Sequence, residues 1–309
     1  MINVYESVDA NKRKSWLVIA GFVAFVILSA VLIAKGIGAY YGYQSTGLEF
    51  TGIALVISGL MSFAGYYFSD SIILGLSGAR PASKKQDFQF FTVTENLCLA
   101  AGLPMPKLYV IDDTAMNAFA TGRDPAHAAI CATTGILSSL NRTELEGVIG
   151  HELSHVGNYD IRLMSVVTVL VGLITLLGDW LLRASWYSNR SRDNENRGSG
   201  AVFMILGLVM ALLSPIIAQL IQLSISRRRE FLADASSAKL TRQPSGLISA
   251  LKKLGADREP LEAANKATAH LYIVNPLKNL SSDARGWFSG LFNTHPPLAD
   301  RIKALEGMS

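Results

Sequence analysis

Cysteine is scarce in this chain, and neither internal repeats nor low-complexity runs are present. The 309 residues include two cysteines, Cys98 and Cys131. They could pair with each other, but two thiols do not indicate the disulfide framework of a small secreted domain. Free thiols fit a reducing compartment. The lack of a fixed sequence period gives no sign of a repeat architecture.

Charged residues are also few. They make up 17% of the chain, hydrophobic residues make up 50%, and the mean hydropathy is +0.30. This composition is apolar for a soluble protein and indicates a membrane part attached to a polar part. The net charge of +4 is modest, and no basic stripe interleaved with aromatic residues is present. A nucleic acid is therefore not an expected partner.

Two uncharged runs predict a transmembrane hairpin within residues 1–79. The runs are Trp16–Ala34 and Phe50–Phe68, and each is close to the roughly 20 residues needed to cross a bilayer. The basic residues before the first run also fit a signal peptide, but that run is too long for one and a second run follows. Basic residues precede the first run and follow the second, so the positive-inside rule places the N-terminus and the chain after Phe68 in the cytoplasm.

A second pair of apolar runs predicts another hairpin, inserted into the globular part. Residues 163–182 carry one charge, Asp179, and residues 201–223 carry none. Asp179 lies near the end of its run, which fits a place at the membrane interface better than a buried functional charge. This inserted hairpin, residues 163–226, divides the globular part into residues 80–162 and 227–309.

The globular part is predicted to be mostly α-helical with a small β-sheet. Short apolar runs bounded by Asp, Gly or Pro predict strands, and longer periodic segments predict helices. The expected strands are Lys107–Ile111, Asn117–Thr121 and His127–Ala132. The expected helices are Thr92–Ala101, Gly135–Leu140, a helix that begins near Asn141 or Thr143, residues 227–254, and Leu298–Leu305.

One short motif carries recognisable chemistry. His151-Glu152-Leu-Ser-His155 reads H-E-x-x-H and follows an apolar run that suits a helix. Residues four apart share a helix face, so both imidazoles would point the same way. They can hold one zinc ion, with Glu152 placed to take a proton from a zinc-bound water. Because the pattern arises by chance in about one chain of this length in a hundred, the rest of a site has to be found.

A catalytic zinc site usually needs a third protein ligand, and Asp160 is the nearer of two candidates. The extended metzincin pattern requires a glycine three residues after the second histidine and a ligand six residues after it. This chain has Asn158 and Ile161 at those positions. On a continued helix Asp160 would lie about 140° away from His155, off the metal face.

The second candidate is Glu230, which begins the segment Glu230-x-x-x-Asp234. On a second helix this spacing supplies a ligand and, one turn later, a carboxylate that can accept the free ring N–H of His151. A surface acid paired with a neighbouring arginine is the plainer alternative for Glu230. With this candidate, the metal ligands would be His151, His155 and Glu230, supported by Asp234.

Three motifs in this order resemble a known family. They are His151–His155, the segment Arg227-x-x-Glu230-x-x-x-Asp234, and Thr294-His295-Pro296-Pro297 followed by Arg301-Ile302. With an apolar hairpin on each side of the first motif, nearly the whole chain resembles the HtpX-type membrane zinc metalloproteases, Glu-zincins related to the CAAX prenyl endopeptidases. The resemblance implies multi-pass membrane helices joined to a compact zincin catalytic domain with one zinc ion per subunit. It also implies an endopeptidase for misfolded or damaged membrane proteins at the cytoplasmic face of the inner membrane.

The resemblance assigns two further roles. It places His295 close to the metal, where it would stabilise the oxyanion or occupy the open coordination position at rest. A histidine that helps to cap the last helix is the alternative, and the arginine of the last motif is expected to serve in an ion pair. Asn117, Ala118, Phe119 and Ala120 match the family's edge strand, to which a substrate backbone would add by main-chain hydrogen bonds.

Two other functions stay open. A dedicated prenyl-peptide protease would carry a larger set of spans enclosing a chamber than the four predicted here. A catalytically silent membrane adaptor would keep zinc for structure, and its expected mark is the loss of Glu152, which is present. The expected partners are polypeptide and membrane-protein substrates and the lipid bilayer.

Overall fold

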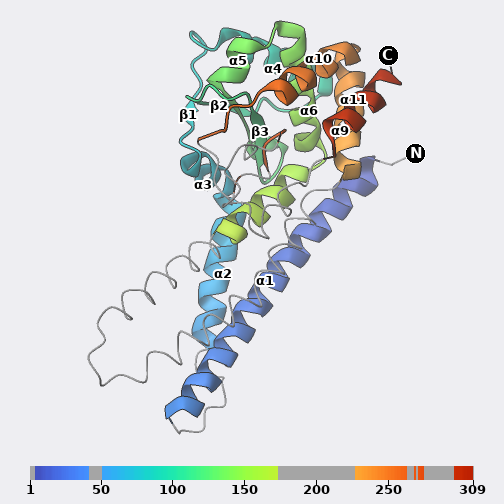
Figure 1. The fold of residues 1–309 in the computed structure, drawn as a ribbon. Helices are drawn as coiled ribbons and strands as arrows, with labels where there is room; N and C mark the ends of the chain where they lie inside the picture. Colours follow the sequence, from blue (N-terminus) through green and yellow to red (C-terminus); the bar gives the residue numbers. More distant parts are fainter. Residues whose placement is uncertain are drawn as a thin grey trace.

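Two long helices lead away from a compact globular part (Figure 1). The computed structural model describes residues 4–41, 51–172, 227–262, 268, 271–274 and 296–308. Helices α1 (Val4–Tyr41) and α2 (Thr51–Tyr67) run side by side, and we call this pair the stalk. The N-terminal end of α1 lies close to α9 in the globular part (Figure 1). His295 and most of the predicted second hairpin, residues 173–226, lie outside the described residues.

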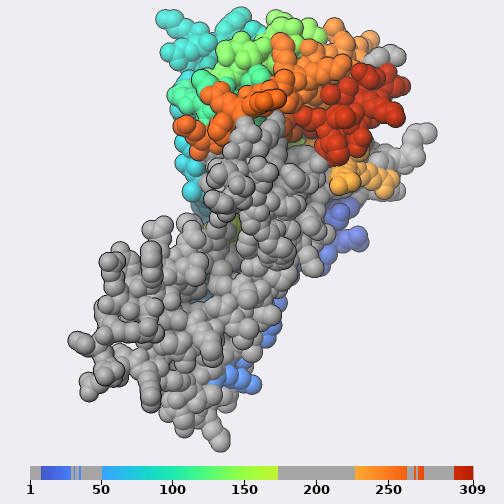
Figure 2. All heavy atoms as spheres, viewed as in Figure 1, coloured from blue at the N-terminus to red at the C-terminus, as the bar shows by residue number. Residues whose placement is uncertain are grey.

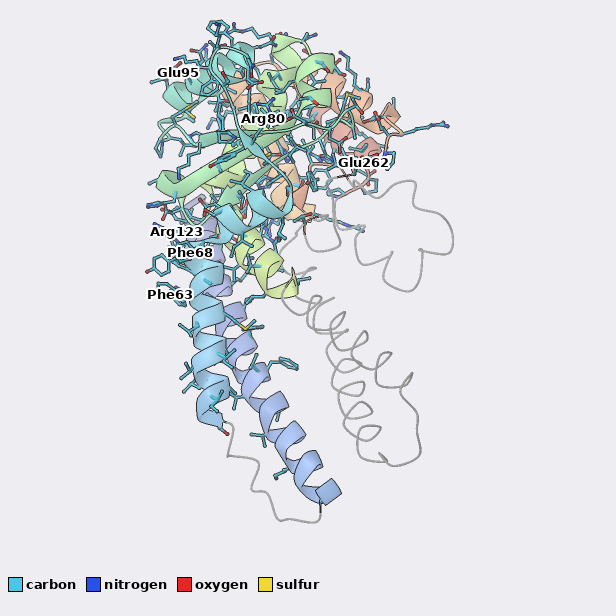
Figure 3. The ribbon with its side chains drawn as sticks, turned by 90° about the vertical axis from the view of Figure 1, so that its left-hand side faces the viewer. Phe63, Phe68, Arg80, Glu95, Arg123 and Glu262 are labelled. Carbon is cyan, nitrogen blue, oxygen red and sulfur yellow. The ribbon has the colours of Figure 1, made fainter. Side chains whose placement is uncertain are left out.

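The stalk presents apolar side chains on its outer surface. Leu60 and Phe63 of α2 are 64% and 55% exposed, and Phe63 and Phe68 point away from the helix (Figure 3). Among the described residues, no helix alone is long and apolar enough to cross a bilayer. Helices α2 and α3 (Ser69–Leu76) reach that length only together, and the chain bends by 79° between them. The spans predicted at 16–34 and 50–68 fall largely within helices but are not confirmed as membrane crossings.

The globular part contains a four-stranded sheet in the order β1-β2-β4-β3. The strands are β1 (Arg80–Pro81), β2 (Lys107–Ile111), β3 (Ala118–Gly122) and β4 (Ala128–Thr133). β2 and β4 are parallel, whereas the other neighbours are antiparallel. The prediction for β2 is confirmed, and the other two strands are confirmed with a shift of one residue. β4 begins late because His127 ends a short 3-10 helix, Pro125–His127, and donates its N–H to the side chain of the N-cap residue Asp124.

Six further helices with assigned bounds complete the described part of the globular region: α4 (Phe88–Ala101), α5 (Thr134–Ser139), α6 (Arg142–Gly157), α9 (Arg227–Thr241), α10 (Pro244–Ala256) and α11 (Leu298–Glu306). The single helix predicted for residues 227–254 is wrong. It breaks at Arg242, where φ is +54°, and Pro244 then opens α10, since proline suits the first turn of a helix and not its interior. α4 begins at Phe88, earlier than predicted, and so carries Phe90 into the core.

Close packing holds α6 against α9 and α10. A Cβ atom at Gly147 would lie 2.7 Å from the backbone nitrogen of Leu247, and one at Gly150 would lie 2.8 Å from Ser237 Oγ. Ser237 Oγ also donates a hydrogen bond to the Gly147 carbonyl at 2.6 Å. These contacts place α9 directly beside the histidine-bearing helix. Helix α11, drawn in red, lies on the surface of this part in Figure 2, and its own residue Leu305 is fully buried.

Candidate metal centre

The start of α6 is fixed by a capping box. The Asn141 side chain accepts a hydrogen bond from the Glu144 N–H, and the Glu144 carboxylate accepts one from the Asn141 N–H. Asn141, rather than Thr143, is therefore the N-cap residue. From this fixed start, the helix carries His151 and His155 on one face, with ring centroids 4.8 Å apart.

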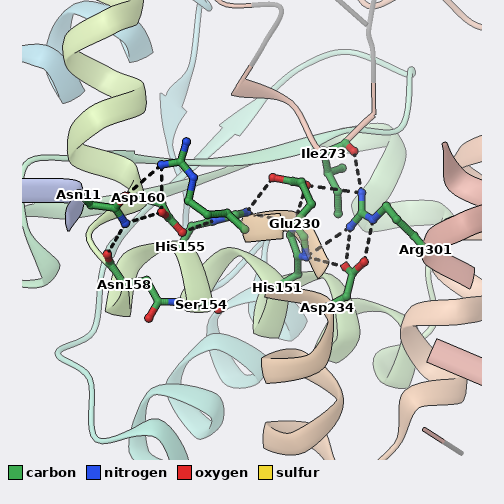
Figure 4. Close-up of polar contacts among 11 residues, drawn as sticks. Asn11, His151, Ser154, His155, Asn158, Asp160, Glu230, Asp234, Ile273 and Arg301 are labelled. Carbon is green, nitrogen blue, oxygen red and sulfur yellow. Dashed lines mark hydrogen bonds and ion pairs between the residues drawn. The ribbon is translucent and has the colours of Figure 1, made fainter. Parts of the chain in front are cut away.

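Three buried side chains from α6 and α9 converge on one point (Figure 4). The Nε2 atoms of His151 and His155 lie 3.2 Å apart. Carboxylate oxygens of Glu230 lie 3.6 Å from His151 Nε2 and 3.5 Å from His155 Nε2. One donor atom from each residue lies within 4.8 Å of the other two, and all three residues are buried. Two imidazole nitrogens and one carboxylate oxygen in this arrangement could hold a metal ion.

A carboxylate orients each imidazole through its other ring nitrogen. His151 Nδ1 lies 2.9 Å from Asp234 Oδ1, and His155 Nδ1 lies 3.1 Å from Asp160 Oδ2. An acceptor at Nδ1 holds the ring proton there and leaves the Nε2 lone pair directed at the centre. Histidines that bind metals in proteins show this same arrangement.

Each of these carboxylates is held in turn by a guanidinium group. Arg301, which is fully buried, donates from Nε and Nη2 to the two oxygens of Asp234 at 2.8 and 2.7 Å. Arg229 Nη1 donates to Asp160 Oδ1 at 3.2 Å, and Asn11 Nδ2 donates to the same oxygen at 2.7 Å. The centre is therefore assembled from α1, α6, the turn after α6, α9 and α11.

Burial and the neighbouring charges shift the pKa values of the supporting groups. Burial by itself would raise the pKa of Asp234, but the hydrogen bonds from Arg301 outweigh it and lower this pKa. Burial would lower the pKa of His155, but the hydrogen bond to Asp160 and the surrounding carboxylates raise it to about 9. Asp234 is therefore ionised at neutral pH, and a metal ion has to displace a proton from His155.

Glu152 lies beside the three donors but is not one of them. Its side chain is buried, and its carboxylate accepts a hydrogen bond from the backbone N–H of Ala120 on β3. Burial raises the pKa of Glu152 above its ordinary value, and the neighbouring Glu230 acts in the same direction. A carboxylate with a raised pKa next to a metal centre suits a general base that works near neutral pH.

The free edge of β3 is already paired over part of its length. The backbone N–H of Ile273 donates to the Ala118 carbonyl at 3.1 Å. The side chain of Asn117 donates to the Val274 carbonyl at 2.9 Å. All four residues of the segment Leu271–Val274 are buried. β3 is an edge strand, as the sequence predicts, but at Asn117 and Ala118 this edge has partners within the chain.

The other two residues proposed for substrate binding differ from each other. Phe119 faces the core, where it is 1% exposed and packs edge-on against Tyr272 with ring centroids 5.1 Å apart. Ala120 lies two residues after Ala118, so its backbone groups face the free edge as well. Its N–H group is the one that contacts Glu152. Ala120 is therefore the residue of the proposed set closest to the candidate chemistry.

The sequence predicted the gathering of His151, His155, Glu230 and Asp234, and the structure brings these four side chains together. Asp160 is not among the three donors, as expected, but the expectation that it points away from His155 is wrong. It assumed a continued helix, but α6 ends at Gly157 and Tyr159 adopts φ +59°, which turns Asp160 back toward the His155 ring.

The sequence did not predict the roles of three residues that support the site. Arg301 was expected in an ion pair, and its link to His151 through Asp234 was not foreseen. Arg229 stands next to Glu230 in the sequence, and that adjacency was the available signal. Asn11 gave no such signal in the sequence, because it lies 149 positions before its partner Asp160.

Known proteins match this chain over most or all of its length. The profile of Peptidase family M48 matches residues 84–309. A "Protease HtpX homolog" from Dictyoglomus thermophilum is 45% identical over 304 residues, covering 98% of this chain and 94% of its own. One from Streptococcus uberis is 42% identical over 308 residues, covering 99% and 100%. The crystal structure of S. mikatae Ste24p is similar with a TM-score of 0.48 and 20% identity, covering 99% of this chain and 66% of that chain.

The family profile spans well over half of the chain, and the two HtpX homologs align with nearly all of it. The motif residues discussed above, from His151 to Arg301, lie inside the matched region. The chain belongs to peptidase family M48, among its HtpX-type metalloproteases.

Proposed function

We propose that this chain is an integral-membrane zinc endopeptidase that cleaves misfolded or damaged membrane proteins at the cytoplasmic face of the inner membrane. The observation that carries this proposal is the buried convergence of His151, His155 and Glu230 beside Glu152. Membership of a peptidase family supports peptide-bond hydrolysis as the reaction. The apolar outer surface of the stalk supports a place in the membrane.

The donor set fits one zinc ion per subunit. Zinc prefers tetrahedral sites, and catalytic zinc takes three protein ligands of nitrogen, sulfur or carboxylate type. His151, His155 and Glu230 supply two such nitrogens and one such oxygen. The Nδ1 hydrogen bonds to carboxylates make both imidazoles stronger donors. When bound, zinc would polarise the attacking water and the substrate carbonyl.

Glu152 performs the proton transfers in this proposal. Its carboxylate takes one proton from water as the water oxygen attacks the carbonyl carbon, and gives that proton to the amine nitrogen when the C–N bond breaks. The other water proton leaves with the new carboxyl group. The Ala120 N–H holds the carboxylate in place during these transfers. His295 would stabilise the oxyanion or occupy the open coordination position at rest.

The substrate backbone would add to the β3 edge at Ala120. Because Ala118 already accepts a hydrogen bond from the buried Ile273, a substrate strand gains its main-chain contact at the Ala120 carbonyl, next to Glu152. Main-chain recognition tolerates many sequences. Selectivity then depends on which polypeptides reach a site at the membrane surface.

Glu152→Gln tests this function. The variant keeps the size of the side chain and removes the base, so we expect cleavage of casein and of a detergent-solubilised membrane protein to fall by roughly 10²-fold or more. Zinc content has to be measured on both proteins and should be equal. A chelator should abolish wild-type cleavage, and added zinc should restore it.

The same assay separates the alternatives. Equal cleavage by wild type and Glu152→Gln would overturn the proposed mechanism. A zinc-loaded wild type without peptidase activity would favour the silent adaptor. Strong preference for a farnesylated peptide over the same unmodified peptide would favour a prenyl-peptide protease.

A further inference from the structure

We infer that Asn11, on the first helix, is a positioning residue for the metal ligand His155 and acts through Asp160. The inference rests on the proposed zinc site. Asn11 lies outside residues 84–309, the region matched by the family profile. Its role would make α1 part of the metal centre as well as part of the stalk.

Both the nitrogen and the oxygen of the Asn11 side-chain amide make hydrogen bonds, and the residue is 2% exposed. Its Nδ2 donates to Asp160 Oδ1 at 2.7 Å and to the Asn158 carbonyl at 3.0 Å. Its Oδ1 accepts from Arg229 Nη1 at 3.2 Å. The amide thus links the turn that follows α6, the helix of His155, to α9, the helix that carries Glu230 (Figure 4).

A single carboxylate group, that of Asp160, connects Asn11 to the metal ligand. Its Oδ1 accepts the hydrogen bond from Asn11, and its Oδ2 accepts one from His155 Nδ1 at 3.1 Å. The orientation of this carboxylate decides where the His155 ring points, and hence where Nε2 lies relative to Glu230. A group that fixes Asp160 therefore acts on the metal site without touching it.

Each of the two histidines has a carboxylate behind it, and the hydrogen bonds that these two carboxylates accept show what Asn11 supplies. Asp234, behind His151, receives three hydrogen bonds, of which two come from the fork of Arg301. Asp160, behind His155, also receives three, but Arg229 contributes one N–H and Asn11 contributes another. Asn11 thus gives Asp160 the second hydrogen-bond donor that the two-nitrogen fork of Arg301 gives Asp234.

The matched control lies one turn further along the same helix. Ser15 is also buried, at 1% exposure, and its Oγ donates at 2.9 Å to the carbonyl of Asn11, within α1 itself. Replacing Ser15 by alanine removes a buried polar atom from the same helix and leaves the Asn11 side chain and Asp160 in place. Any general effect of disturbing α1 should appear in this variant too.

The experiment measures metal binding by the full-length protein in detergent, using chelator competition for Zn²⁺ and the visible absorption of bound Co²⁺. Removal of a supporting partner lowers metal affinity by roughly 10- to 100-fold when it contacts the ligand directly, so we expect about three- to tenfold for Asn11→Ala. Ser15→Ala should bind zinc like the wild type. The Co²⁺ spectrum should change in the Asn11 variant and not in the Ser15 variant.

Two further variants separate positioning from packing. Asn11→Asp keeps the size but replaces the donor by a carboxylate that repels Asp160, so its zinc affinity should fall more than that of Asn11→Ala. A packing role predicts the reverse order. In an Asp160→Asn background, Asn11→Ala should cause little additional loss, because its effect passes through Asp160.

Failure of the inference differs from failure of the proposed function. Wild-type zinc binding that is lost in His155→Ala, together with unchanged affinity and Co²⁺ spectrum in Asn11→Ala, would overturn the role of Asn11 alone. An equal loss from Asn11→Ala in both backgrounds would also overturn it. A wild-type protein that binds no zinc would overturn the site and the inference together.

Discussion

At the scale of single residues, the centre depends on buried charges that neutralise one another. Asp234 and Arg301 are 1% and 0% exposed, and the carboxylate lies between the guanidinium group and His151. A buried ion is costly unless it is paired and hydrogen-bonded in good geometry. The planar fork of Arg301 meets this condition, since it contacts both oxygens of Asp234 and holds its pKa low.

Arg301→Lys keeps the positive charge and removes the fork. Lysine cannot reproduce the two parallel hydrogen bonds to Asp234, nor the further one that Arg301 Nη1 donates to the Ile273 carbonyl at 3.3 Å. We expect the free energy of unfolding to fall by about 2 kcal/mol, as for loss of one hydrogen bond to a charged group, and zinc affinity to fall with it. Thermal unfolding and chelator competition measure the two effects. Lys303→Arg, an exposed change on the same helix, should alter neither, and equal behaviour of the two variants would contradict the prediction.

Spacing along a helix predicted the candidate donors but not all of the groups that support them. His151, His155 and Asp234 follow from repeats of one turn, because that periodicity holds as long as the helix continues. Asp160 does not follow, because the positive φ of Tyr159 is a property of the folded turn that spacing does not reveal. The sequence therefore identified the donor atoms better than the groups that orient them.

At the scale of elements, α6 is the part that the chain fixes most firmly. Its N-terminus carries the capping box, and the Glu144 carboxylate also accepts from Ser249 Oγ at 2.6 Å and from Lys253 Nζ at 2.7 Å on α10. Gly147 then permits α10 to approach the helix backbone. The position of His151 therefore depends on contacts made a full turn and more before it.

Glu144 makes the stability of this helix depend on pH. Burial opposes its charge, but the hydrogen bonds from Lys253 and Ser249 outweigh burial and lower the pKa of Glu144. A carboxyl group with a lowered folded-state pKa stabilises the fold above its unfolded-state pKa of about 4.3, and this stabilisation is lost as the pH falls through the folded-state value. Glu144→Gln keeps a capping side chain and removes the charge.

We expect Glu144→Gln to unfold more easily than the wild type at pH 7, by about 1 kcal/mol, since Lys253 is 43% exposed and partly screened. The difference should shrink below pH 4 and vanish once the wild-type carboxyl group is protonated. Thermal unfolding of both proteins across this pH range is the measurement. A difference that persists unchanged at low pH would mean that the cap, and not the charge, is responsible.

The elements themselves were predicted where local signals agree. β2 and α11 appear at the expected places because their apolar patterns and flanking turn residues are strong. The break between α9 and α10 was missed, although Pro244 was visible in the sequence, because the apolar spacing continues past it. The pairing of the segment Leu271–Val274 with β3 depends on contacts distant in the sequence, which no local pattern encodes.

At the scale of the whole molecule, distant segments meet because α6 and α9 pack side by side and α1 reaches back to them. The contacts from Asn11 to Asp160 and from Arg301 to Asp234 join parts separated by 149 and 67 positions. A centre assembled in this way requires the stalk and the globular part to be fixed relative to each other. The proposed membrane anchorage of the stalk would then fix the site relative to the bilayer.

The proposed membrane placement predicts which surfaces water can reach. Leu60 on α2 and Phe88 on α4 are similarly exposed, at 64% and 61%, but one lies on the stalk and the other on the globular part. Cysteines introduced at these two positions should differ in their reaction with a water-soluble maleimide. The native thiols give little background, because Cys98 and Cys131 are buried and burial raises the pKa of Cys98 to about 11.

In sealed inside-out membrane vesicles, we expect Phe88→Cys to react and Leu60→Cys to stay unlabelled until detergent is added, because lipid covers the stalk and the globular part faces the cytoplasm. In intact cells a maleimide that cannot cross the membrane should label neither. The extent of labelling is read by a mass shift on gels. Labelling of Leu60→Cys in sealed vesicles would contradict lipid burial of α2, and labelling of Phe88→Cys in intact cells would reverse the orientation. The first result would remove the physical reason for expecting membrane proteins to be the substrates, and the second would place the site at the opposite face of the membrane.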